Sequence, residues 1–63
     1  MTSSREVSRY RENWQKEIDG NALYNSLAEI EPKPELAEVY RRLAASEVKH
    51  ALVWEKQLQE AGA

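Results

Sequence analysis

The segment 31–34, Glu-Pro-Lys-Pro, divides the chain and is its one predicted turn. Each proline restricts the residue before it to extended backbone angles, so no helix can run through the segment. The second proline suits the first position of a new helix. The sequence therefore predicts one helix over about 4–30 and a second over about 34–60.

The start of the first helix has its own signal. Met1–Ser4 is a short polar lead-in, and Ser3 and Glu6 have the spacing of a capping box. We therefore expect the helix to begin near Ser4. At the second helix Lys33 is a poor N-cap, so that start depends on Pro34 and on nearby acidic residues.

Composition narrows the fold class and the partners. Two glycines, two prolines and no phenylalanine in 63 residues leave little material for a sheet. No cysteine is present, which excludes disulfides and thiolate metal sites. There is no apolar run near the 18 or so residues of a membrane span, no signal-peptide pattern and no basic block for nucleic acid. We expect an all-α cytoplasmic chain without nucleic-acid or membrane contact.

Two helices near 40 Å long, joined by a short turn, must pack as an antiparallel hairpin. A chain this short buries only about 60% of its unfolded surface, so a lone hairpin core is marginal. The first helix also carries two apolar arcs that point in different directions. The main stripe holds Tyr10, Trp14, Tyr24 and Ala28, and the second arc holds Leu23, Leu27 and Ile30.

Two apolar arcs need two helical neighbours, and a hairpin offers one. Gly20 lies beside the second arc, where it costs about 1 kcal/mol relative to alanine in a helix but admits the close approach of another backbone. Val39 and Val53 similarly lie outside the main stripe of the second helix. We therefore expect residues 1–63 to form a half-domain that pairs with a second chain into a four-helix bundle.

A carboxylate lies within the apolar stripe of each helix. Glu47 shares its face of the second helix with apolar residues, and Glu17 does so in the first helix. The stripe around Glu47 holds Leu36, Tyr40, Leu43, Ala44, Ala51, Trp54 and Leu58. Each glutamate is 15 residues from Pro32, so the hairpin places both at a similar depth. Carboxylates in such a stripe are costly unless compensated, and no basic residue lies on either stripe near them.

A metal ion would compensate these charges. His50 follows Glu47 by three residues, so Glu-x-x-His shares one helix face. Two hairpins would supply four carboxylates and two imidazoles, which is the ligand set of a ferritin-like di-iron or di-manganese centre. Imidazole raises the preference for iron over calcium or magnesium. Four aromatic residues within two turns would exclude water and offer tyrosine hydroxyls to the carboxylates: Trp14, Tyr24, Tyr40 and Trp54.

Residues 10–24 (YRENWQKEIDGNALY) and 36–44 (LAEVYRRLA), with Glu17 and Glu47-x-x-His50, resemble ferritin-like and rubrerythrin-like domains. The similarity is greatest to the N-terminal domains of membrane-bound ferritins, which are fused to vacuolar-iron-transporter-type membrane proteins, and it extends over about 9–62. Those domains continue into two more helices with a further Glu and Glu-x-x-His, followed by a transmembrane region. The encapsulated ferritins, by contrast, are half-size and build their di-iron site across a dimer.

The resemblance implies that Glu17, Glu47 and His50 are iron ligands and catalytic residues, two sets per site, in a homodimer or a larger even-numbered oligomer. It implies oxidation of Fe(II) by oxygen or peroxide, as in a ferroxidase or rubrerythrin, for iron storage, detoxification or delivery to a transporter. Manganese and zinc are alternative metals. The competing hypotheses are a non-catalytic helical dimerisation module with protonated glutamates and an inactive fragment of a larger membrane-bound ferritin.

Overall fold

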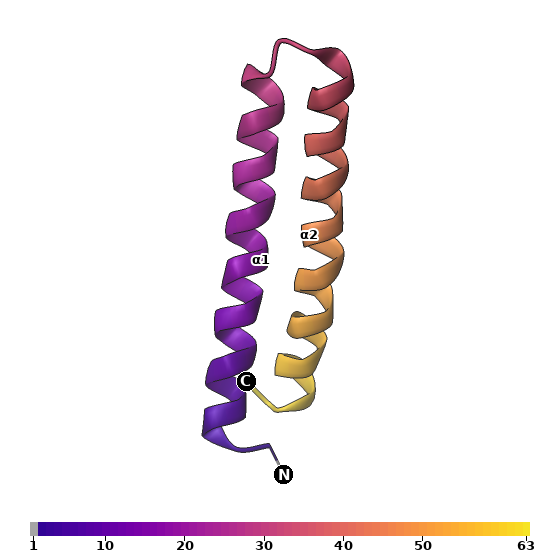
Figure 1. The fold of residues 1–63 in the computed structure, drawn as a ribbon. Coiled ribbons are helices and arrows are strands. Elements are labelled where there is room, and N and C mark those ends of the chain that lie inside the picture. The colour runs from indigo at the N-terminus through magenta and orange to yellow at the C-terminus, as the bar shows by residue number, and fades with distance from the viewer. Residues whose placement is uncertain (1) are drawn as a thin grey trace.

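The computed structural model describes residues 2–63, and Met1, part of the expected lead-in, lies outside this range. The chain forms two α-helices, α1 (Ser4–Ile30) and α2 (Pro34–Glu60). They run side by side in opposite directions, with both termini at one end and the turn at the other (Figure 1). The all-α hairpin predicted from the sequence is therefore confirmed.

Local contacts define the helix ends. The Glu6 N–H donates to Ser3 Oγ at 3.1 Å, and the Ser3 hydroxyl donates to the Glu6 carboxylate at 3.3 Å, so the expected N-terminal cap of α1 is present. Lys33 makes no side-chain cap for α2, which begins at Pro34. In the turn, the Lys33 N–H donates to the Glu31 carboxylate at 3.2 Å. This bond gives the Lys33 N–H an acceptor in place of the carbonyl that it would have inside a helix.

The line of closest contact between the helices is made of alanine. Among residues 2–63 the buried hydrophobic side chains are Ala28, Ala37, Ala44 and Ala51. The three in α2 are seven residues apart, the spacing at which one helix keeps the same side chains facing its neighbour. Small side chains on this line let the two backbones approach closely.

This core corrects the expected stripe of α2. Leu36 and Leu43, which we expected in this stripe, are 37% and 40% exposed, whereas Ala37, which the predicted stripe omitted, is buried. The reason is steric. The closest line of an antiparallel pair accepts only small side chains, so larger ones lie along its flank.

Aromatic pairs lie between the helices on either side of the midpoint. Tyr10 stacks on Trp54 with ring centroids 6.0 Å apart, and Tyr24 stacks on Tyr40 at 6.4 Å. Each pair joins α1 to α2. The two pairs therefore bracket the middle of the hairpin, where Glu17 and Glu47 lie.

The hairpin is elongated and leaves much apolar surface exposed. It measures 48 × 13 × 10 Å and has a radius of gyration of 14.4 Å, against about 11 Å for a compact chain of this length. Its accessible surface is 4866 Å², against about 4,200 Å² for a compact monomer of the same mass. Leu23 and Ile30, in the second arc of α1, are both exposed. Within residues 2–63 neither helix has the length and apolar character needed to cross a membrane.

Candidate metal centre

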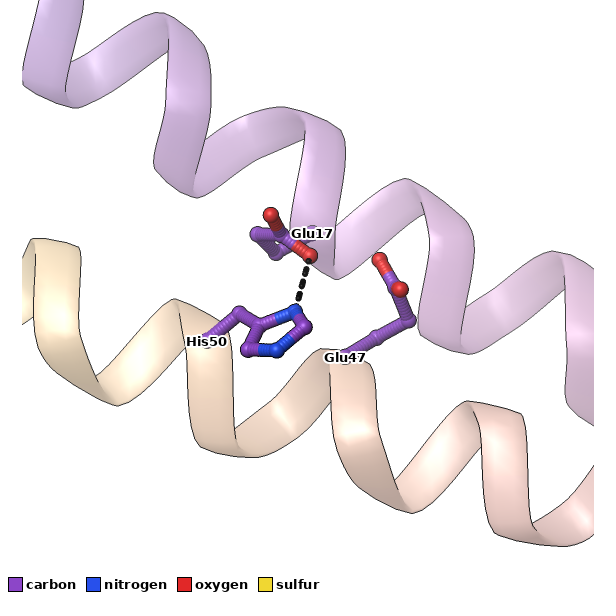
Figure 2. A group of neighbouring side chains, drawn as sticks. All are labelled: Glu17, Glu47 and His50. Carbon is purple, nitrogen blue, oxygen red and sulfur yellow. Dashed lines mark hydrogen bonds and ion pairs between the residues drawn. The ribbon is translucent and has the colours of Figure 1, made fainter.

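The midpoint of the hairpin brings together the three residues that the sequence singled out. Glu17 projects from α1, and Glu47 and His50 project from α2 (Figure 2). One ligand atom from each side chain lies within 4.8 Å of the others. His50 Nδ1 is 3.3 Å from Glu17 Oε2. Residues from opposite halves of the sequence thus form one cluster, named here the Glu–Glu–His cluster.

The cluster is shielded from one side and open on the other. The Glu17 side chain is 22% exposed and that of His50 is 56% exposed. Glu47 is half-buried. An open side leaves room for further ligands to approach from outside the hairpin.

Gly20 makes room for the Glu47 carboxylate. A Cβ atom at this position would lie 2.6 Å from Glu47 Oε2 and 3.1 Å from its carboxyl carbon. We expected Gly20 to admit another backbone, but within the hairpin its close neighbour is this side chain. The missing Cβ therefore forms a notch on α1 in which the carboxylate of α2 lies.

The electrostatics of the cluster favour an added positive charge. Interaction with the Glu17 carboxyl through a side-chain hydrogen bond raises the pKa of Glu47; partial burial and the negative charge of Glu17 raise it further, while His50 lowers it. Within residues 2–63 no lysine or arginine forms an ion pair with Glu17 or Glu47. The two carboxylates therefore repel each other with only one imidazole beside them.

The donor atoms fit a divalent transition metal. Two carboxylates and one imidazole suit iron, manganese or zinc, and they are poor ligands for copper(I), which prefers sulfur. A cation would favour the ionised form of Glu47, whose pKa the hydrogen bond with Glu17, partial burial and the charge of Glu17 raise. Three protein ligands with one open side form an incomplete coordination shell.

The aromatic neighbours take different positions from those expected. Within residues 2–63 no tyrosine hydroxyl bonds to Glu17 or Glu47, so the expected hydroxyl contacts are absent. Tyr24 is seven residues from Glu17, which is about 10 Å along a helix and beyond hydrogen-bond reach. Trp14 lines an open groove with Arg11 and Leu58 near the chain termini. Tyr24, Tyr40 and Trp54 belong to the stacks above and below the cluster.

Asn21 is a residue of the site region that the sequence reasoning missed. Its Nδ2 donates to the Ala44 carbonyl of α2 at 2.8 Å. A signal was present, because Trp14, Asn21 and Ala28 are seven residues apart, as are the buried alanines of α2. A seven-residue repeat would have placed Asn21 at the helix contact.

The comparisons with known proteins give one match. The family model described as Rubrerythrin matches residues 11–62, a segment that contains most of α1 and all of α2. All three residues of the Glu–Glu–His cluster lie inside it. No curated protein and no solved structure matches the chain significantly.

Proposed function

Because the chain belongs to the rubrerythrin family, and ferritin-like proteins hold paired metal ions with helix-borne Glu and Glu-x-x-His residues, we propose that Glu17, Glu47 and His50 bind iron as half of a di-iron centre. The observation that carries the proposal is the convergence of their ligand atoms within 4.8 Å, beside the notch at Gly20.

One hairpin supplies half of the ligands. It offers two carboxylates and one imidazole, whereas a ferritin-like di-metal site uses four carboxylates and two imidazoles. A second copy related by a two-fold axis would supply the same three ligands again. We therefore propose a homodimer, or an even-numbered oligomer built from such dimers, with the centre between chains.

One face of the hairpin suits the second copy. The contact between Glu47 and the Gly20 position shows that these residues lie on the same side. Leu23 and Leu27 follow Gly20 on that face of α1, and Leu36 and Leu43 precede Glu47 on that face of α2. Leu23 is 57% exposed. This surface, named here the Gly20 face, combines apolar side chains with the open side of the cluster.

The activity proposed is oxidation of Fe(II) by oxygen or peroxide. Bound iron supplies the electrons for that reaction. Glu17 and Glu47 contribute negative charge that balances divalent ions, and His50 contributes a nitrogen that favours iron over magnesium or calcium. The aromatic pairs on either side limit the access of water along the helix contact. Manganese and zinc would bind the same donors.

The biological setting proposed is cytoplasmic iron storage, detoxification or delivery. The resemblance of residues 10–24 and 36–44 to membrane-bound ferritins supports delivery to a transporter domain in a longer parent protein. One observation favours a second candidate, a non-catalytic dimerisation module. The raised pKa of Glu47 makes this glutamate easier to protonate than a free one, which is the direction that this candidate requires.

Anaerobic Fe(II) titration followed by exposure to oxygen separates the two candidates. We expect one iron per chain, a rise in native mass from one chain to two, and a near-ultraviolet absorption band of ferric iron after oxygen is added. Glu47→Gln should lose the iron and the band. Glu38→Gln is the matched control, because Glu38 is an exposed glutamate that pairs with Arg41 and Arg42. Full iron content in Glu47→Gln would exclude the proposed centre.

A further inference from the structure

Asn21 ties α1 to the backbone of α2 close to the Glu–Glu–His cluster. Its Nδ2 donates to the Ala44 carbonyl at 2.8 Å in a half-buried setting. Asn25 donates to Asn21 Oδ1 at 3.4 Å, which orients the amide with its nitrogen toward α2. Within residues 2–63 the other polar side-chain contacts between the helices lie inside the cluster, where His50 pairs with Glu17.

The position of this bond relates it directly to the cluster. Asn21 follows Glu17 by four residues, and Ala44 precedes Glu47 by three, so each lies one turn from a cluster residue on the same helix face. Any axial movement of α1 along α2 that broke the bond would also separate Glu17 from Glu47. The bond is therefore present in the same axial alignment of the two helices that brings Glu17 to Glu47.

The alanine core by itself resists sliding only weakly. Ala37, Ala44 and Ala51 are similar small side chains that recur every two turns along α2. The Asn21 amide reaches the backbone at Ala44 because no long side chain stands in the way. A slide of one turn would bring Tyr40 or Val48 to that level, where a larger side chain would block the amide. A single polar residue at a helix contact specifies alignment in coiled coils in the same way.

We infer that Asn21 is a positioning residue, whose bond to the Ala44 carbonyl sets the axial alignment of α1 and α2 and so brings Glu17 to Glu47 and His50. The consequence for iron rests on the proposed function. The alignment itself is a property of the metal-free hairpin.

Spin-label distances test the alignment without metal. Ser8→Cys and Arg42→Cys place labels at two exposed positions that lie far apart along the long axis, and the chain contains no native cysteine. Labelled chains are diluted into unlabelled chains so that only distances within a chain are recorded. In this background Asn21→Leu should broaden the distance distribution or displace it by about 5 Å, one helical turn. Asn21→Asp, which keeps the shape and removes the donor, should do the same.

The matched control is Asn13→Leu. Asn13 is a half-buried asparagine of the same helix that makes no hydrogen bond to α2 within residues 2–63. The distance between the two labels in Asn13→Leu should therefore have the same distribution as in the parent. A parental distribution in both Asn21→Leu and Asn21→Asp would overturn the inference.

Iron binding gives the second readout. With helical content retained, Asn21→Leu should bind Fe(II) at least tenfold more weakly than the parent and Asn13→Leu, and parental affinity in Asn21→Leu would contradict the inference. If the parent itself binds no Fe(II), the proposed function fails. The spin-label distances then decide the role of Asn21 by themselves.

Discussion

At the scale of single residues, Gly20 shows how one position can oppose helix stability and serve a site. Glycine in a helix interior costs about 1 kcal/mol relative to alanine. A Cβ there would come within 2.6 Å of Glu47 Oε2, so alanine requires the carboxylate to move. The site and the helix therefore prefer different residues at this position.

Gly20→Ala should separate these two effects. We expect the metal-free protein to keep its unfolding midpoint or raise it, because the helix gains and only one side chain is displaced. Fe(II) affinity should fall at least tenfold. Thermal unfolding and anaerobic titration measure the two quantities. Ser26→Ala, an exposed substitution of similar size in the same helix, is the control and should leave affinity unchanged. Parental affinity in Gly20→Ala would show that the notch is not needed.

Glu47 links the cluster to pH. Its pKa in the folded hairpin is raised above its ordinary value of 4.5, so the folded state holds this proton more tightly than the unfolded state does. Stability therefore falls as pH rises from the unfolded-state pKa through the folded-state pKa, and it is not regained at neutral pH. The metal-free cluster is thus a source of instability when Glu47 is ionised.

Glu47→Gln should be more stable than the parent near neutral pH in the absence of metal, because the amide carries no charge. The difference should shrink near pH 4, where the parent carboxyl is protonated. Urea unfolding at both pH values, with chelator present, measures it. Added Zn(II), which is insensitive to oxygen, should raise the stability of the parent and not of the variant. A metal-free variant that is less stable than the parent at neutral pH would contradict the electrostatic account.

At the scale of helices, the ends of α1 and α2 were predictable because they depend on neighbours in sequence. Ser3 with Glu6 forms a cap that needs only a few residues, and each proline acts on the residue before it. The buried line of α2 was predicted only in part, because the expected stripe contained Ala44 and Ala51 but not Ala37. Apolar character ranks Leu36 and Leu43 above Ala37, but an antiparallel neighbour at short distance selects the smallest side chains.

At the scale of the whole molecule, the hairpin has more accessible surface than a compact monomer of its mass, and several large apolar side chains are exposed on it. The Gly20 face carries exposed leucines from both helices, and the proposed centre needs ligands from a second copy. Iron binding and association should therefore be coupled: whatever weakens the dimer weakens the centre, by thermodynamic linkage.

Leu23→Gln combined with Leu43→Gln should test this coupling. We expect the double variant to remain monomeric at concentrations where the parent dimerises with Fe(II), and to bind iron at least tenfold more weakly. Sedimentation velocity and titration measure the two effects. Leu52→Gln is the control, because Leu52 is a leucine of similar exposure (58%) that points about 140° away from Glu47 around α2. Iron-dependent dimers in the double variant would place the partner on another face.

The sequence by itself determined the two helices, their turn and the residues of the Glu–Glu–His cluster. These follow from short-range rules: proline geometry, capping, and the shared helix face of residues three apart. Only the tertiary structure decided that alanines form the contact line, that Gly20 receives a carboxylate and that Asn21 bonds across to α2. Those features depend on how closely and at what alignment two helices approach, which is a property of the pair and of no single segment.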